Sequence, residues 1–188
     1  VCSSDLFETA YDQDFFKRHK LGAGIHFDRE IWGEKRMVPY DLGAFDDYIP
    51  VMPSRLSAEQ AVDKMPISAE AKKQFVGLLT TKDDRLSKIP KADKWDYLYN
   101  ISYRDFLVKH LGISQAEVLA VLQDLTVDSG VGIDSINAFN AMSYGGLPGW
   151  NATGLPALES DEAYIHHFPD GNASIARQLV RKMIPAVA

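Results

Sequence analysis

Hydrophobic residues recur every three or four positions through the middle of the chain, between residues 57 and 125. This period places apolar side chains on one face of an α-helix and leaves the opposite face polar. We therefore expect amphipathic helices that pack through these faces into a common core and do not line a cofactor. The clearest stripes are Ala71, Phe75, Leu78 and Leu79; Tyr103, Phe106 and Leu107; and Val118, Val121, Leu122 and Leu125.

Serine residues mark the predicted starts of these helices. The segments Ser57–Gln60 and Ser114–Glu117 have the spacing of a capping box, and Ser102–Asp105 is a looser version. In a capping box the serine hydroxyl accepts the backbone N–H three residues on, and the Gln or Glu side chain reaches back to the serine N–H. We expect both arms of the motif at residues 57 and 114.

The chain before residue 57 carries weaker patterns. Residues 7–20 mix aromatic and charged side chains, which favours a short helix whose Phe and Tyr residues pack inward. Residues 24–28 and 34–38 have the composition of short strands joined through a turn region at Trp32-Gly33. These two strands predict a β-hairpin.

Two segments lack a clear helix or strand pattern. Proline or glycine at positions 39, 43, 50 and 53 interrupts regular structure after the hairpin. The stretch 129–156 is rich in glycine and aromatic residues, among them Tyr144 and Trp150. Such stretches are most often loops over the core, and they also let the backbone approach a ligand closely.

Residues 164–181 predict a strand, a tight turn and a helix. The turn would be Pro169-Asp170-Gly171-Asn172, because proline fixes φ while glycine and asparagine tolerate positive φ. Exposed N–H groups at such a turn suit an anionic or polar ligand. The helix that follows has an apolar stripe of Ile175, Ala176, Leu179, Val180 and Met183.

The side chains of this segment have structural as well as functional interpretations. On a strand, His166 shares a face with Tyr164, and His167 points to the opposite face. Either histidine could be a hydrogen-bonded structural residue, and Asp170 could be a turn or helix-cap residue. The histidines make a weak metal site, because no third ligand stands at a suitable spacing.

Charge and motifs exclude several function classes. The 188 residues include 20 Lys and Arg against 26 Asp and Glu, a net charge of −6, with no basic stripe to neutralise phosphates. We therefore expect no nucleic-acid partner, and no apolar run reaches the ~18–20 residues of a membrane span. One cysteine, Cys2, allows no internal disulfide and no cysteine-based metal site. The sequence also lacks the Gly-x-Gly-x-x-Gly, phosphate-loop, His-Glu-x-x-His and Gly-x-Ser-x-Gly motifs.

The ends of the sequence favour an internal piece of a longer protein. Residues 1–6 resemble translated sequencing-adaptor sequence, and we expect them to lie outside the fold; the alternative is a natural terminus. At the other end, the sequence stops at residue 188, just after the predicted amphipathic helix.

The segment Tyr164–Arg181 resembles a block of the bacterial spermidine dehydrogenase-like flavoproteins, which belong to the flavin-dependent amine oxidase class. Gln178 stands where that family usually has an apolar residue. Asn172 replaces the second glycine of a related Pro-x-Gly-Gly turn, and asparagine tolerates the positive φ that the turn needs. Further similar stretches follow the family order through most of residues 7–188, at residues 10–15, 27–30, 101–107, 130–134 and 146–149.

The resemblance implies an α+β fold in two parts. Residues 7–162 would form a largely helical substrate-side region, with a β-hairpin near its start and mainly helix after residue 57. Residues 163–188 would be the strand–turn–helix that returns to an α/β FAD-binding domain, the rest of which lies outside this sequence.

The resemblance also implies oxidation of an amine, a polyamine such as spermidine, by hydride transfer to FAD. Haem is a second candidate cofactor, with His166 or His167 as its contact. The implied catalytic residues, on the substrate side, are Asp170, Tyr164 and His166. The implied cofactor-binding residues are Pro169, Gly171, Asn172 and Ser174.

There are two alternatives to a flavin-dependent enzyme. One is a non-catalytic module that binds a polyamine or another small molecule, and the other is a purely structural helical module. Without a dinucleotide fingerprint, the 188 residues alone are expected to be inactive. In the binding module, scattered carboxylates would attract the cation: Asp46, Asp47, Asp83, Asp84, Asp161 and Glu162.

Overall fold

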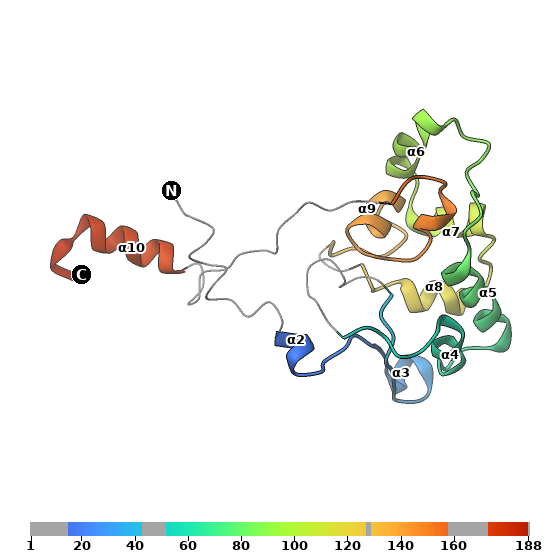
Figure 1. Ribbon diagram of the computed structural model, residues 1–188, viewed down its shortest axis with the longest axis horizontal. Helices are drawn as coiled ribbons and strands as arrows, with labels where there is room; N and C mark the ends of the chain where they lie inside the picture. The colour runs from blue at the N-terminus through green and yellow to red at the C-terminus, as the bar shows by residue number, and fades with distance from the viewer. Residues whose placement is uncertain (1–14, 43–51, 127–128, 158–172, 188) are drawn as a thin grey trace.

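The computed structural model describes residues 15–42, 52–126, 129–157 and 173–187 (Figure 1). The α-helices are α2 (Phe15–Arg18), α3 (Arg29–Trp32), α4 (Ala58–Asp63), α5 (Ala69–Thr80), α6 (Lys94–Asn100), α7 (Tyr103–Leu111), α8 (Ala116–Leu122), α9 (Ala138–Ser143) and α10 (Ala173–Met183). The strands are β1 (Ile25–Phe27) and β2 (Arg36–Val38), and the 3-10 helices are η1 (Lys91–Asp93), η2 (Trp150–Ala152) and η3 (Pro185–Val187).

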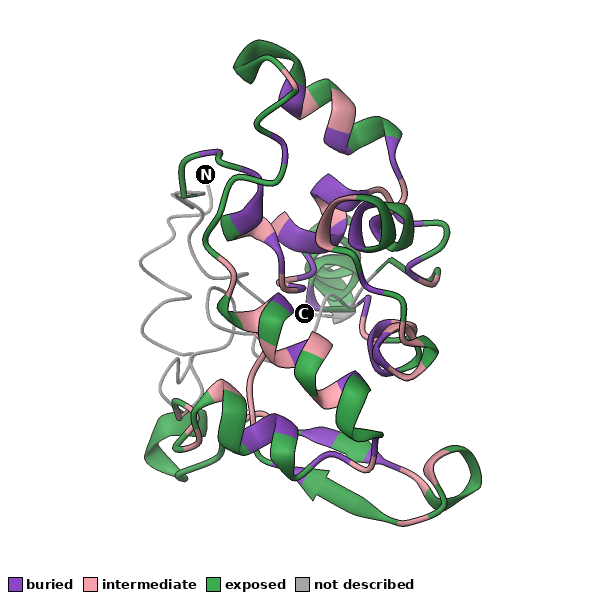
Figure 2. Ribbon diagram, turned by 90° about the vertical axis from the view of Figure 1, so that its right-hand side faces the viewer, coloured by how far each residue is buried: buried purple, intermediate pink, exposed green. Residues whose placement is uncertain are grey.

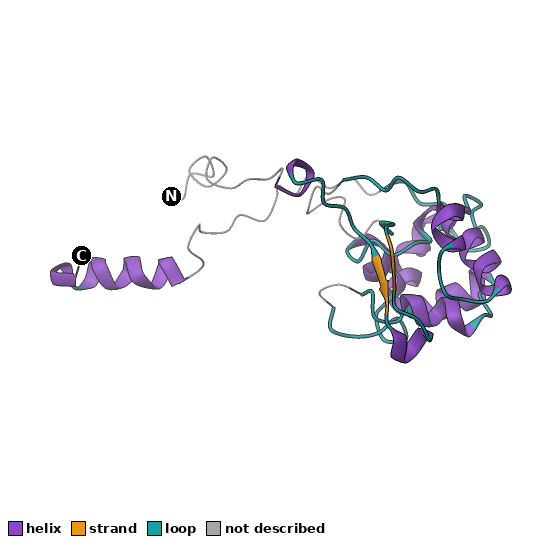
Figure 3. Cartoon of the chain, turned by 90° about the horizontal axis from the view of Figure 1, so that it is seen from below, coloured by secondary structure: helices purple, strands orange, loops and turns teal. Residues whose placement is uncertain are grey.

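The described part of the chain is α+β, as predicted. Helix predominates, and the sheet that the described residues contain is a two-stranded hairpin beside the helices (Figure 3). Of the predicted return segment, the structure describes α10, while the predicted strand and turn at residues 164–172 lie outside the described residues. The described ranges include no parallel sheet of a flavin-binding domain.

The predicted β-hairpin is confirmed, with one difference at its turn. Strands β1 and β2 are antiparallel, and the buried Phe27 and Val38 face the core. Between the strands, residues 29–32 form the helical turn α3. Asp28 caps this turn by accepting the Ile31 N–H at 2.7 Å, and Gly33 ends it with a φ of +77°. The connection is therefore a capped helical turn that closes on a left-handed glycine.

The predicted helical stripes form the core. Helix α5 packs against α4 and α8, and α9 packs against α6 and α7. Phe75 from the stripe of α5 is fully buried, and so are Tyr103 and Phe106 from the stripe of α7. Figure 2 shows such buried residues gathered where the helices face one another. The three- and four-residue spacing thus places these side chains between helices, as expected.

The predicted inward packing of the aromatic residues in 7–20 is wrong for the two that the structure describes. Phe15 and Phe16 lie on α2 and are exposed, and their rings contact each other edge to face. A helix of one turn presents too little apolar surface to hold a fixed position against a core. The other aromatic residues of this stretch lie outside the described residues.

Two of the three predicted caps are confirmed. At the start of α4, the Gln60 N–H donates to the Ser57 hydroxyl at 3.2 Å and the Ser57 N–H donates to the Gln60 Oε1 at 3.0 Å, which completes the capping box. At α7, the Ser102 hydroxyl accepts the Asp105 N–H at 3.1 Å. These caps use side chains within one turn of each other, so sequence spacing alone predicts them.

The capping box predicted at Ser114 is wrong, because α5 and α8 cap each other instead. Glu117 of α8 accepts the Ser68 N–H at 3.0 Å and also the Ser68 hydroxyl, at the start of α5. In return, Gln74 of α5 accepts the N–H groups of Ser114 and Gln115 at 2.9 and 3.0 Å, just ahead of α8. Packing between the two helices therefore redirects the side chains that the local motif would have used.

Replacing Gln74 with alanine should lower the free energy of unfolding by about 1 kcal/mol, because two N–H groups at the start of α8 lose their acceptor. Lys73→Ala on the exposed side of the same helix is the matched control and should stay within about 0.5 kcal/mol of the wild type. Urea unfolding followed by circular dichroism measures both. Equal midpoints for the two variants would show that the side chain of Gln74 adds no stability.

Helix α10 forms where the sequence predicts it, but its apolar stripe is exposed. Ile175, Leu179, Val180 and Met183 are all exposed, and α10 lies apart from the helical body in Figures 1 and 3. Within the described ranges, no helix has both the length and the apolar character needed to cross a membrane.

Candidate functional site

The residues predicted to carry chemistry fall mostly outside the described part of the chain. The described member is Ser174, the second residue of α10, which is buried. Those outside the described residues are Tyr164, His166, His167, Pro169, Asp170, Gly171 and Asn172. Among the residues that are described, no group of three or more His, Cys, Asp or Glu side chains could hold a metal ion.

The most distinctive side-chain arrangement of the described residues is an aromatic cluster, which we define as Trp95, Tyr99, Phe139, Tyr144 and Trp150. The ring of Phe139 on α9 is at its centre. Its centroid lies 4.3 Å from that of Tyr99, in a stacked pair, and 5.5 Å from that of Trp95. The rings of Trp150 and Tyr144 follow at 6.0 and 6.3 Å, both edge to face. These are the separations at which aromatic rings attract one another.

The cluster is buried at its centre and exposed at its edge. Phe139 is 7 % exposed, whereas Tyr99 is 48 % exposed and Tyr144 is 63 % exposed. Trp95 and Trp150 are half-buried against the core. Asp96 stands one turn before Tyr99 and is the exposed charged residue of α6. The cluster therefore presents the rings of Tyr99 and Tyr144 to solvent, and α6 also carries the exposed carboxylate of Asp96.

Backbone hydrogen bonds hold α6, which carries Trp95 and Tyr99, beside α9, which carries Phe139. The Ala138 N–H donates to the Ile101 carbonyl at 2.9 Å, and the Tyr103 N–H donates to the Ile136 carbonyl at 2.9 Å. Through these bonds the end of α6 and the start of α9 are fixed side by side. In the segment that carries the remaining tryptophan, the Trp150 indole N–H donates to the Pro156 carbonyl at 3.0 Å. The rings thus sit on elements whose relative positions are set by backbone hydrogen bonds.

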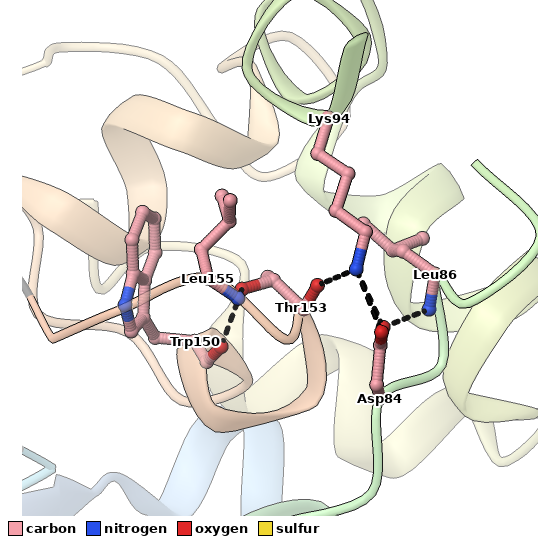
Figure 4. Close-up of polar contacts among 6 residues, drawn as sticks. All are labelled: Asp84, Leu86, Lys94, Trp150, Thr153 and Leu155. Atoms are coloured by element: carbon pink, nitrogen blue, oxygen red, sulfur yellow. Dashed lines mark hydrogen bonds and ion pairs between the residues drawn. The ribbon is translucent and has the colours of Figure 1, made fainter. Parts of the chain in front are cut away.

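An ion pair between the buried Lys94 and the more exposed Asp84 anchors the Trp150 segment to the start of α6. The Lys94 ammonium donates to both carboxylate oxygens of Asp84 at 2.8 Å and to the Thr153 carbonyl at 2.6 Å. Only 4 % of the Lys94 side chain is exposed, against 38 % for Asp84. The Lys94 hydrogen bonds lower the pKa of Asp84. Figure 4 shows the indole of Trp150 on the far side of its turn from this ion pair.

Two of the carboxylates that the sequence analysis named as candidates for attracting a cationic ligand already pair with cations of the chain. Asp84 already binds Lys94, and Asp83 pairs with Arg85 at 3.5 Å. Both therefore have a cationic partner within the chain. The remaining four, Asp46, Asp47, Asp161 and Glu162, lie outside the described residues.

His110 is a titratable group that the sequence patterns do not single out. Its Nε2 lies 2.7 Å from the Tyr97 hydroxyl, and its ring also packs against Phe106. Burial, and after it the charge of Lys109, lowers the pKa of His110. The imidazole is therefore neutral at pH 7, and it links α6 to α7 as a structural hydrogen-bonding residue.

Parts of the aromatic cluster have sequence signals and parts do not. Trp95 and Tyr99 are four residues apart, which places them on one face of a helix. Tyr144 and Trp150 belong to the glycine- and aromatic-rich stretch 129–156, which we expected to form loops over the core. That expectation is wrong for residues 138–143, because they form the helix α9, which Asn137 caps and which buries four side chains against its neighbours. Nothing in the sequence indicates that both sets meet at Phe139, because that contact joins positions about 40 residues apart.

Comparison with known proteins adds no assignment to this geometry. No protein-family model matches the chain, and no curated protein matches it either.

Proposed function

We propose that this chain is part of an FAD-dependent oxidoreductase that oxidises an amine, a polyamine such as spermidine. The observation that carries the proposal is the segment Tyr164–Arg181, together with the ordered series of further stretches that resemble the same family of flavoproteins. The sequence holds no dinucleotide fingerprint, so the AMP and pyrophosphate half of FAD would bind to a part of the parent protein outside these residues.

The described start of α10 is compatible with a cofactor-facing role. Its first turn contains no acidic residue, and it includes Ser174. The N–H groups at the N-terminus of a helix favour an anionic or polar group, and a carboxylate in that turn would oppose it. When bound, FAD supplies a hydride acceptor for the carbon beside the amine nitrogen, and water then hydrolyses the resulting imine to an aldehyde.

The roles proposed for this chain are to bind and orient the amine. Asp170, Tyr164 and His166 would lie on the substrate side, where a neutral amine nitrogen is needed for hydride loss from the adjacent carbon. Pro169, Gly171, Asn172 and Ser174 would shape the turn that faces the cofactor. Haem is kept as a second candidate cofactor, with His166 or His167 as its contact.

The test is the Asp170→Ala variant of the complete protein encoded by the source gene. We expect kcat/KM for spermidine to fall by about 100-fold, while the flavin absorbance per protein stays at the wild-type level. Asp63→Ala, an exposed carboxylate on α4, is the matched control and should leave kcat/KM unchanged. Wild-type kinetics for the Asp170 variant would remove that residue from the site, and a complete protein without flavin would overturn the oxidoreductase.

The aromatic cluster favours a second candidate, a non-catalytic module that binds polyamines or another small molecule. Its rings lie on the helical body and need no contribution from a flavin domain. This candidate predicts that the complete protein binds spermidine without oxidising it. Calorimetry with spermidine, combined with an assay of amine oxidation on the same preparation, separates the two candidates.

A further inference from the structure

We propose that the aromatic cluster is a binding surface for a small alkylammonium cation. This inference deepens the second candidate function and rests on it; it uses the geometry of the helical body and requires neither flavin nor the residues of the Tyr164–Arg181 segment. Two of its rings are about half or more exposed although they are fixed against a buried phenylalanine. Both exposed rings contact the same buried side chain, Phe139, so they lie around one point of the surface.

The exposed charges of η1 and α6 favour a cation, because the carboxylates of Asp93 and Asp96 stand there against the one exposed ammonium of Lys91. The faces of aromatic rings carry partial negative charge and attract ammonium groups, most strongly those of tryptophan and tyrosine. Asp96 adds a full negative charge one turn from Tyr99. The other charged residue of α6, Lys94, is buried and directs its ammonium to Asp84 and Thr153. The described surface of α6 therefore repels an anion and leaves the rings available to a positively charged ligand.

The cluster is also held in place before a ligand arrives. The hydrogen bonds of Ala138, Tyr103 and Trp150 fix the elements that carry its rings. A preformed surface loses little conformational freedom on binding, so even a small cation can bind measurably. A cation with several methyl or methylene groups around its nitrogen would fit best, because it contacts ring faces without needing many hydrogen bonds.

The experiment is a titration of the ¹⁵N-labelled 188-residue chain with tetramethylammonium chloride, followed through the indole N–H resonances. The chain has three tryptophans, and two of them, Trp95 and Trp150, belong to the cluster. We expect these two resonances to move to saturation. Trp32 packs on Phe27 beside the hairpin and should stay unmoved as the internal reference. Sodium chloride at equal ionic strength corrects for salt.

A neutral ligand and matched variants test the chemistry. The uncharged 3,3-dimethylbutanol should move neither resonance at concentrations where choline, its charged counterpart, does. Tyr99→Leu and Tyr144→Leu should each raise the Kd about two- to five-fold, and Tyr99→Phe, which keeps the ring, should leave it unchanged. Asp96→Asn should weaken binding, whereas Asp63→Asn, on α4, should not.

Several results would overturn the proposal. These are the absence of saturable movement at Trp95 and Trp150, equal movement with the neutral alcohol, and equal movement of Trp32. The wild-type titration alone can produce each of them, so the proposal does not depend on the variants folding. The titration contains neither flavin nor an oxidisable amine, and its outcome is therefore independent of amine oxidation by the complete protein.

Discussion

Replacing Lys94 with methionine is expected to lower the free energy of unfolding by about 2 kcal/mol. The ammonium has three donors, and all three are used: two bonds to Asp84 and one to the Thr153 carbonyl. Methionine fills the space of the side chain but leaves the buried carbonyl of Thr153 without its donor. Thermal and urea unfolding followed by circular dichroism give the change.

The control for this variant is Lys91→Met, on the exposed surface of η1, which should change stability by less than about 0.5 kcal/mol. If Lys94→Met were as stable as Lys91→Met, the contacts of the Lys94 ammonium would add nothing to the free energy of unfolding. A double variant, Lys94→Met with Asp84→Ala, should cost less than the sum of its single changes, because the two residues act through one contact.

The contact between Lys94 and Asp84 also makes the free energy of unfolding depend on pH in the acid range. Hydrogen bonding to Lys94 holds the pKa of Asp84 below its ordinary value of 3.8. A carboxylate with a lowered pKa in the folded state contributes stability that is present above its unfolded pKa and is lost as the pH falls through the folded pKa. This loss of stability should therefore occur below pH 3.8, and it should be smaller in Lys94→Met, which lacks the hydrogen bond.

Gly154→Ala should be about as destabilising, by about 2 kcal/mol, for a steric and a conformational reason. Gly154 has a φ of +67°, which costs an alanine about 1–2 kcal/mol. A Cβ built there also lies 2.4 to 2.8 Å from the carboxylate atoms of Asp84. These distances are too short for real contacts, so the turn or the ion pair must move.

Gly112 offers a matched control for this change. It has the same φ of +67°, but a Cβ there meets nothing within 4 Å. Gly112→Ala should therefore show the conformational cost alone, about 1 kcal/mol. Urea unfolding of both variants isolates the clash with Asp84 as the difference between them. Equal losses would mean that the carboxylate moves aside freely and that the ion pair tolerates the extra methyl group.

The ion pair and the aromatic cluster are coupled through the chain. Lys94 is adjacent to Trp95, and Thr153 is three residues from Trp150. Loosening the contact between Lys94 and Thr153 frees the two tryptophans to move relative to each other. We therefore expect Lys94→Met to weaken tetramethylammonium binding as well as stability.

Much of the helical body follows from local sequence. The three- and four-residue spacing of apolar residues predicts α5, α7 and α8 and the side chains that they bury. The caps at Ser57 and Ser102 are predicted because both partners of each bond lie within one helical turn. The hairpin follows from two short runs of strand composition on either side of a turn. These features depend on backbone geometry over a few residues, which sequence spacing expresses directly.

The aromatic side chains show where this local reasoning ends. Phe15 and Phe16 have the same apolar character as Phe75, yet they are exposed because α2 has no element packed over it in the described residues. Burial of an aromatic ring depends on what the rest of the chain places against it. Composition alone therefore predicts which rings could be buried but not which ones are.

Short-range patterns predict helices α5, α7 and α8 with their buried faces, the hairpin, and the caps at Ser57 and Ser102. Packing between distant segments produces the mutual capping by Glu117 and Gln74, the burial of Lys94 and the meeting of the aromatic rings at Phe139. Spacing in the sequence does not express these contacts, because their partners lie far apart in the chain. Lys94 and Thr153 are 59 residues apart, and a contact of that kind exists only once packing has brought the two segments together.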